Sequence, residues 1–188
     1  DELQSALVLL AWVLLTGGLH LDGLADSADA WAGSNGDRDK ALRIMKDAAS
    51  GPAGVTAVTL VLLIKFAALS MLIRETVWLG LILAPLLGRM AVVLLFLTTP
   101  YIRPDGLGSA QAAFLPRRAA TVALIVFAVA MIGLGTTGIW ALAVALGFVL
   151  LLRAMMIRRL GGATGDTLGA ACELIETAVL VTMALVSS

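Results

Sequence analysis

The sequence is poor in charged residues and in cysteine. Charged residues make up 14% of its 188 residues, whereas hydrophobic residues make up 60%. Soluble domains are about 45–50% apolar and about 25% charged, so this composition excludes an ordinary soluble domain and indicates a membrane protein. The formal net charge is zero, which excludes a long-range field that would attract nucleic acid. The single cysteine, Cys172, excludes an internal disulfide and a metal-binding thiol pair.

We also expect no cleavable secretory signal. No basic leader precedes Leu3, and no small-residue cleavage site is followed by a soluble domain. The chain begins with Asp1 rather than methionine and enters an apolar run almost at once. We therefore expect further amino-terminal membrane sequence before this point.

Six apolar stretches are long enough to span a membrane, which takes roughly 17–25 mostly apolar residues. They are residues 3–19, 55–73, 77–97, 119–137, 139–156 and 168–186. We therefore predict an all-α fold, a polytopic transmembrane helix bundle of about six spans that forms one integral membrane domain over residues 1–188. Its longer loops, which we call the motif loops, fall at about 21–54, 98–118 and 157–167.

With six spans, the motif loops share one side of the bundle, and that side carries nearly all the basic residues. They are Arg38, Lys40, Arg43, Lys46, Arg103, Arg117, Arg118, Arg158 and Arg159, with Arg153 close by. The opposite side carries Arg74. Because positive residues in short loops mark the cytoplasmic side, we expect a protein of the cytoplasmic membrane with cytoplasmic motif loops.

The first motif loop contains a cluster of carboxylates. Asp22, Asp26 and Asp29 stand at positions i, i+4 and i+7, which places all three on one face of a helix. Their mutual repulsion favours a divalent cation, and Mg²⁺ prefers oxygen ligands and leaves positions open for substrate phosphates. The alternative is a solvated acidic helix end, which the position next to a membrane span makes less favourable.

Two further residues extend this cluster. His20 is as well explained by a structural role as by a role as ligand or base. Asp47 stands at the end of a helix predicted over residues 37–49, whose apolar face suits the membrane interface.

Two cationic residues lie inside predicted spans, Lys65 in the second and Arg89 in the third. A charge at the centre of a span costs roughly 2.5–3.5 kcal/mol on insertion scales, so such residues usually face the bundle interior and find partners. Glu173 and Glu176, one turn apart in the last span, are the candidate partners. A buried ion pair and a cationic pocket for phosphate both remain open.

Glycines punctuate the other two motif loops. Gly161, Gly162 and Gly165 end a helix and let backbone N–H groups approach an anion. Asp166 follows them, either as a site residue or as the N-cap of the last span. The segment 104–106 (PDG) is a turn signal.

Several motifs in sequence resemble one family. They are residues 16–30 (TGGLHLDGLADSADA), 44–47 (IMKD) with Gly51 and Gly54, Lys65 with Phe66, Arg89, Arg103 with 105–108 (DGLG), and 161–170 (GGATGDTLGA). Taken in this order, they resemble the cobalamin synthase, or adenosylcobinamide-GDP ribazoletransferase, family. The resemblance covers nearly the whole chain, although members of the family have further membrane sequence before this point.

The resemblance implies the last step of nucleotide-loop assembly. A hydroxyl group of α-ribazole, or of its 5′-phosphate, attacks the cobinamide-linked phosphorus of adenosylcobinamide-GDP. GMP leaves, and adenosylcobalamin or its 5′-phosphate is formed. The resemblance also implies Mg²⁺ as the cofactor and a place in the lipid bilayer of a bacterial or archaeal membrane. Nucleic acid is not an expected partner, and a homo-oligomer stays open.

The chemistry of phosphoryl transfer assigns expected roles, because it needs charge neutralisation and positioning above all. The expected metal ligands are Asp22, Asp26, Asp47 and Asp166. The expected catalytic residues are His20 and Asp29, the latter as a base or a further ligand. The expected substrate-binding residues are Lys65, Arg89, Arg103 and Asp105.

Three other functions stay open on the residues alone. CDP-alcohol phosphotransferases share an Asp-Gly-x-x-Ala element, but here Asp26 follows Ala25 where that family carries arginine, and its downstream aspartates are missing. Membrane prenyltransferases have two Asp-rich motifs, whereas one is found here. A transporter would spread polar residues through its spans and often shows an internal repeat, and neither is evident.

Overall fold

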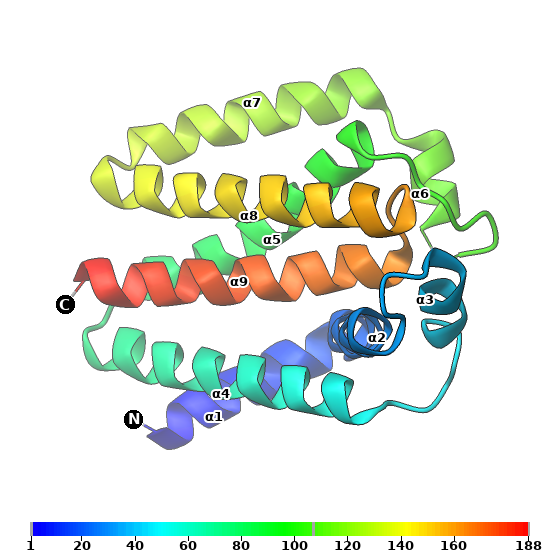
Figure 1. Ribbon diagram of the computed structural model, residues 1–188. Helices are drawn as coiled ribbons and strands as arrows, with labels where there is room; N and C mark the ends of the chain where they lie inside the picture. The colour runs from blue at the N-terminus through cyan, green and yellow to red at the C-terminus, as the bar shows by residue number, and fades with distance from the viewer. Residues whose placement is uncertain (1, 107, 188) are drawn as a thin grey trace.

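The computed structural model describes residues 2–106 and 108–187, so Asp1, Ser188 and Leu107 of the 105–108 (DGLG) motif lie outside the described residues. Nine helices follow one another in these ranges (Figure 1). They are α1 (Glu2–Leu15), α2 (Leu19–Gly33), α3 (Arg38–Ile44), α4 (Pro52–Arg74), α5 (Trp78–Thr98), α6 (Ser109–Phe114), α7 (Arg117–Gly133), α8 (Thr136–Leu160) and α9 (Gly165–Ser187). The predicted all-α bundle of membrane helices is confirmed.

Helix α9 forms the centre of the bundle. It packs against α2, α4, α5 and α8, and in Figure 1 it runs between α4 and α8. In its most apolar stretch 67% of the residues are buried, against 22–39% in α4, α5 and α8. A helix that is apolar all round belongs in the interior, and the fully buried side chains of Ile175, Val179 and Leu180 fit that rule.

The number of spans is lower than expected. Among the described helices, α4, α5, α8 and α9 are long and apolar enough to cross a membrane, and α1 with α2 adds a fifth if the bent pair counts as one span. Helix α7 has 17 residues, at the lower limit of roughly 17–25 for a span. The predicted count of six therefore exceeds the four or five that helix length and composition support.

The first predicted span, residues 3–19, ends early at a glycine pair. Gly17 and Gly18 have φ angles of 63° and 70°, in the left-handed region that glycine adopts without steric cost. The chain bends there by 85° between α1 and α2. Helix α2 consequently lies across the end of the bundle, where Figure 1 shows it almost end-on, and we do not count it among the spans.

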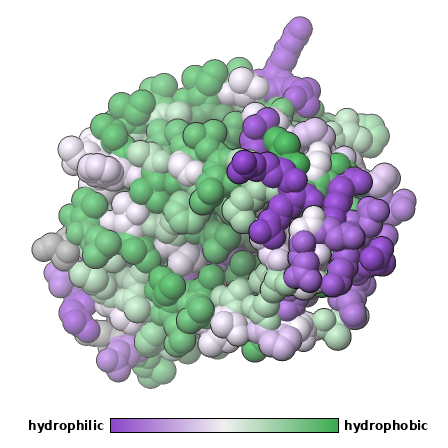
Figure 2. Space-filling model, viewed as in Figure 1, coloured by the Kyte–Doolittle hydropathy of each residue, from purple (hydrophilic) through white to green (hydrophobic). Residues whose placement is uncertain are grey.

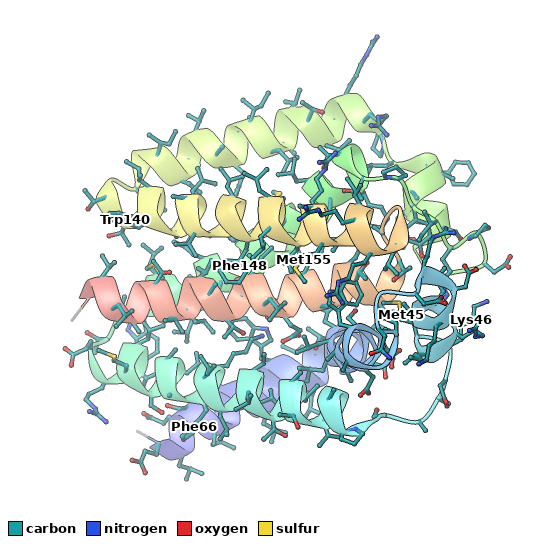
Figure 3. All side chains as sticks on the ribbon, in the orientation of Figure 1. Met45, Lys46, Phe66, Trp140, Phe148 and Met155 are labelled. Atoms are coloured by element: carbon teal, nitrogen blue, oxygen red, sulfur yellow. The ribbon has the colours of Figure 1, made fainter. Side chains whose placement is uncertain are left out.

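Polar residues gather at the end of the bundle where α2 lies. Figure 2 shows hydrophilic side chains over this end, while the flank facing the viewer is largely hydrophobic. Figure 3 shows Met45 and Lys46 at this end and Trp140 at the opposite end of α8. We call this end, formed by α2, α3, α6 and the loops 99–108 and 161–164, the motif face.

Candidate functional site

A cavity of about 740 Å³ opens on the motif face between α2, α5, α6 and α9. Its volume lies within the roughly 300–1,000 Å³ of ligand pockets. Seven of the predicted site residues line it: His20, Asp22, Asp26, Asp47, Arg103, Asp105 and Asp166. The structure therefore brings together residues from all three motif loops.

Two of these loops are joined through their backbones. Tyr101 and Ala163 form an isolated parallel β-bridge. The N–H of Ile102 donates to the carbonyl of Ala163 at 2.9 Å, and the N–H of Ala163 donates to the carbonyl of Pro100 at 2.8 Å. A Cβ atom at Gly162 would collide with that Pro100 carbonyl, so a glycine is required for this approach.

The bridge brings Arg103 beside Asp166. Nη1 of Arg103 lies 2.6 Å from Oδ2 of Asp166, and both side chains are only partly exposed. Thr164, rather than Asp166, caps the start of α9. Its Oγ1 accepts from the N–H of Thr167 at 3.2 Å, and Oγ1 of Thr167 accepts in return from the N–H of Thr164. Asp166 is thus one residue inside the helix and faces the cavity.

Helices α2 and α9 meet closely beneath the cavity because both carry glycine at the contact. A Cβ atom at Gly23 would lie 2.7 Å from the backbone oxygen of Asp166, and one at Gly169 would lie 3.2 Å from Cα of His20. The first distance is too short for any Cβ atom unless the helices move apart, and the second is tighter than an ordinary contact. The close approach sets the aspartates of α2 next to Asp166.

The carboxylates of the cavity affect one another. Burial, together with the charges of Asp22 and Asp166, raises the pKa of Asp26 to about 6. Repulsion of this kind favours a cation at the site. Among residues 2–106 and 108–187, however, no three His, Cys, Asp or Glu side chains are arranged to hold a metal ion by themselves.

Asp29 does not line the cavity. Its Oδ2 accepts from the N–H of Gly51 at 2.7 Å, and its Oδ1 accepts from the N–H of Gly54 at 2.9 Å. Both N–H groups belong to the start of α4, where the first backbone donors have no partner within the helix. In this arrangement the carboxylate predicted as a base instead caps α4 from the neighbouring helix.

Lys65 also lies away from the cavity, in a buried charge network. Its Nζ is 2.6 Å from Oε2 of Glu173 and 2.5 Å from Oε2 of Glu176. Arg89 pairs with the other oxygen of Glu176, and the indole N–H of Trp12 donates to Glu176 at 3.1 Å. The predicted glutamate partners are confirmed, and of the two roles left open the ion pair is the one observed.

Comparisons with known proteins agree along the whole chain. The family model for cobalamin-5-phosphate synthase matches residues 1–184. The chain is 55% identical over 183 residues to the adenosylcobinamide-GDP ribazoletransferase of Stutzerimonas stutzeri, covering 97% of this chain and 75% of that protein. The enzyme of the same name from Pseudomonas fluorescens is 56% identical over 185 residues, covering 97% of this chain and 76% of that protein. No solved structure matches.

The chain belongs to the adenosylcobinamide-GDP ribazoletransferase family. This membership decides against the phosphotransferase, prenyltransferase and transporter families that the residues alone left open. The long apolar helices of the structure agree with this family, since the resemblance implies a membrane protein.

Three polar or charged side chains of the cavity were not predicted as site residues. Lys46 lines the cavity beside Asp47, and its place in the IMKD motif was a usable signal. Tyr101 and Gln111 line it as well, and nothing in the sequence pattern distinguished them. The cations beside the aspartates are therefore Lys46 and Arg103, rather than Lys65 and Arg89.

Proposed function

We propose that the chain joins α-ribazole, or its 5′-phosphate, to adenosylcobinamide-GDP and releases GMP. The observation that carries this proposal is the motif-face cavity, in which carboxylates and cations from three loops of a ribazoletransferase family member converge. A transfer at the phosphorus of a diphosphate-bearing substrate needs such a mixed site, because positioning and charge neutralisation supply most of the catalysis.

The step forms one bond and breaks one. A hydroxyl oxygen of the ribazole bonds to the cobinamide-linked phosphorus, while the bond from that phosphorus to the bridging oxygen of the diphosphate breaks. The bridging oxygen leaves with GMP, and the hydroxyl proton passes to a base. Lys46 and Arg103 bind the diphosphate oxygens and offset the charge that develops on the leaving group.

His20 is the base that the geometry favours. It lines the cavity, and its Nδ1 is buried without a hydrogen-bond partner among the described residues. Burial and the charge of Arg89 lower the pKa of His20 below the usual imidazole range, so its side chain is neutral near pH 7 and can accept the hydroxyl proton. Asp29 is assigned a structural role as the cap of α4 instead, since both of its oxygens already accept hydrogen bonds from that helix.

The aspartates of the cavity fit Mg²⁺ held jointly with substrate. Mg²⁺ is usually bound through one or two carboxylates plus phosphate oxygens, and Asp22 and Asp26 supply the carboxylates, with Asp47 and Asp166 nearby. When bound, the ion would neutralise charge on the diphosphate.

We further propose that the motif face is cytoplasmic and that the membrane is the cytoplasmic membrane. The uneven distribution of arginine and lysine supports this orientation, because positive residues flank spans on the cytoplasmic side. The substrates would then reach the cavity from the cytoplasm.

The first test measures GMP release by the full-length protein in lipid, supplied with adenosylcobinamide-GDP, α-ribazole and Mg²⁺. We expect release that requires the acceptor and stops with EDTA. Release without the acceptor would indicate hydrolysis, and release unaffected by EDTA would overturn the metal assignment.

Separate Asp22→Asn and Asp26→Asn variants test the carboxylates. We expect each to lower kcat by at least about 100-fold, since removing one electrostatic contact in a preorganised site costs 10²–10³. Asp39→Asn is the matched control, because Asp39 is an exposed carboxylate of α3 outside the cavity lining. Normal transfer by both site variants would contradict the proposal.

A further inference from the structure

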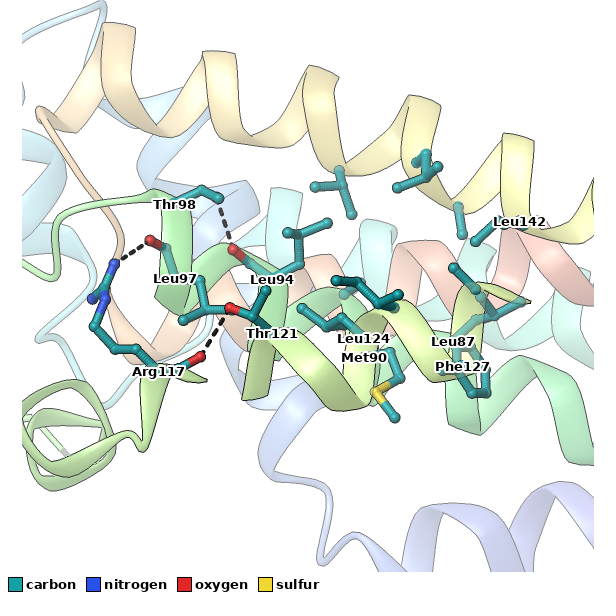
Figure 4. A pocket seen from close by; sticks show the side chains of 16 residues that line it. Leu87, Met90, Leu94, Leu97, Thr98, Arg117, Thr121, Leu124, Phe127 and Leu142 are labelled. Atoms are coloured by element: carbon teal, nitrogen blue, oxygen red, sulfur yellow. Dashed lines mark hydrogen bonds between the residues drawn. The ribbon is translucent and has the colours of Figure 1, made fainter. Parts of the chain in front are cut away.

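A second cavity, of about 500 Å³, lies between α5, α7 and α8 (Figure 4). Its walls are almost wholly apolar and include Leu87, Leu94, Phe127 and Leu142. Two threonines also line it, but their hydroxyls are engaged: Oγ1 of Thr98 donates to Leu94 O, and Oγ1 of Thr121 donates to Arg117 O, both at 2.8 Å. The interior therefore suits hydrocarbon rather than a polar ligand.

The cleft has the depth of one membrane leaflet. On α5 its lining extends from Leu87 to Thr98 at the motif face. Eleven helical residues rise about 16 Å at 1.5 Å each. Half of a hydrocarbon core that is about 30 Å thick is about 15 Å, so the cleft matches the acyl region of the leaflet at the motif face.

The end of the cleft at the motif face is cationic. Nη2 of Arg117 donates to Leu97 O at 2.7 Å, and Nε and Nη2 of Arg153 donate to Thr98 O at 3.1 and 2.9 Å. Both guanidinium groups are thereby held at the carboxyl end of α5. A guanidinium has five N–H donors, so each retains donors for an anion.

We propose that this cleft binds an anionic phospholipid, with one acyl chain between α5, α7 and α8 and the phosphate at Arg117 and Arg153. Basic pockets between membrane helices bind anionic headgroups in this way. The apolar walls, the leaflet-sized depth and the charge at one end each select for this ligand. The site is separate from the motif-face cavity and does not depend on the reaction there.

The test is native mass spectrometry of the purified full-length protein with added phosphatidylglycerol or phosphatidylcholine. Ala128→Phe fills the cleft, because Ala128 lines it. Ala123→Phe adds the same side chain to α7 at an exposed position outside the lining. Arg117→Gln removes the charge at the mouth, and Arg74→Gln removes an exposed arginine at the opposite end of the bundle.

We expect retained phosphatidylglycerol adducts to exceed phosphatidylcholine adducts by about fivefold, and Arg117→Gln to lower that preference. Ala128→Phe should abolish the retained adduct, whereas Ala123→Phe and Arg74→Gln should bind like the unaltered protein. Equal retention of the two lipids, or adducts unchanged by Ala128→Phe in a folded preparation, would overturn the proposal. Glycerol 3-phosphate, which carries the charge without the chain, should give no adduct, and binding equal to that of the lipid would also overturn it.

Discussion

At the scale of single residues, identical side chains of α2 have different surroundings. Asp22 and Asp26 line the motif-face cavity, whereas Asp29, one turn further on, binds the first backbone N–H groups of α4. Sequence spacing places all three on one face of the helix. The partner across that face differs along its length, and this difference sets the role of each carboxylate.

Replacing Asp29 should lower stability more than chemistry. Asp29→Ala removes both acceptors at the start of α4, and we expect a loss of about 1–2 kcal/mol in the free energy of unfolding. Asp29→Asn should lose less, since its amide oxygen can still accept one bond. Thermal unfolding in detergent measures the loss, and kcat per folded molecule should stay near that of the unaltered protein. A folded Asp29→Asn protein without activity would restore the catalytic role.

Lys65 should be needed for folding. Lys65→Met leaves Glu173 and Glu176 buried with one cation fewer, and removing one partner of a buried pair costs about 3–5 kcal/mol. Adding Glu173→Gln restores the charge balance with Arg89 and should recover part of the folded yield. Thermal unfolding monitored by tryptophan fluorescence measures both effects.

Arg74→Met is the control for this pair, because Arg74 is an exposed cation at the end of the same helix. It should leave the unfolding temperature nearly unchanged. If Lys65→Met were equally stable, the network would not hold the bundle together.

Much of the cavity lining and of the buried charge network could be predicted from sequence, for reasons that differ by residue. The aspartates of α2 stand in a spaced motif beside a span, and Lys65 and Glu173 are charges in apolar helices that must pair. Tyr101 and Gln111 gave no such signal, because the loop pairing at Ala163 and the position of α6 bring them to the cavity. The sequence predicts a catalytic role for Asp29 because its spacing matches that of Asp22 and Asp26. Its contacts with Gly51 and Gly54 join residues 22 and 25 positions apart, and no local pattern reveals them.

At the scale of elements, five apolar runs became α4, α5, α7, α8 and α9 with ends shifted by a few residues. Hydropathy predicts such helices because burial of polar backbone in lipid requires them. The path of α2 was not predicted. Gly17 and Gly18 permit the left-handed φ angles that the bend requires, but the packing of α2 on α9 fixes the direction of α2.

Gly23 should be essential to this packing. Gly23→Ala would place Cβ 2.7 Å from Asp166 O and push α2 away from α9, and overpacking of this kind costs about 1–3 kcal/mol. We expect at least a tenfold loss of kcat, because a displacement of about 1 Å at an active site can cost 10²-fold. GMP release and thermal unfolding measure the two effects.

Gly147→Ala is the matched control on α8. Among the described residues, and leaving aside the adjoining residues and backbone of α8 itself, no atom lies within 4 Å of a Cβ added there. Alanine is favoured over glycine inside a helix by about 0.5–1 kcal/mol, so this variant should be as stable as the parent or more so, with full activity. Equal losses in both variants would show that the close contact of Gly23 with Asp166 does not govern the result.

At the scale of the whole molecule, the motif face and the opposite end should meet different compartments. Cysteines introduced separately by Lys40→Cys and Glu75→Cys mark the two ends, and native Cys172 is fully buried. A membrane-impermeant maleimide should label position 40 in inverted vesicles alone and position 75 in right-side-out spheroplasts alone. The reverse pattern would place the motif face outside the cytoplasm.

The central position of α9 has a consequence for biosynthesis. Lys65 enters the nascent chain 108 residues before Glu173, which at roughly 5–20 residues per second is a delay of about 5–20 s. During that interval α4 and α5 have left the ribosome without the helix on which they pack. An elongating chain therefore carries the cation of Lys65 in α4 without its glutamate partners, and ribosome stalling before α9 would leave this cation recognisable to membrane quality control.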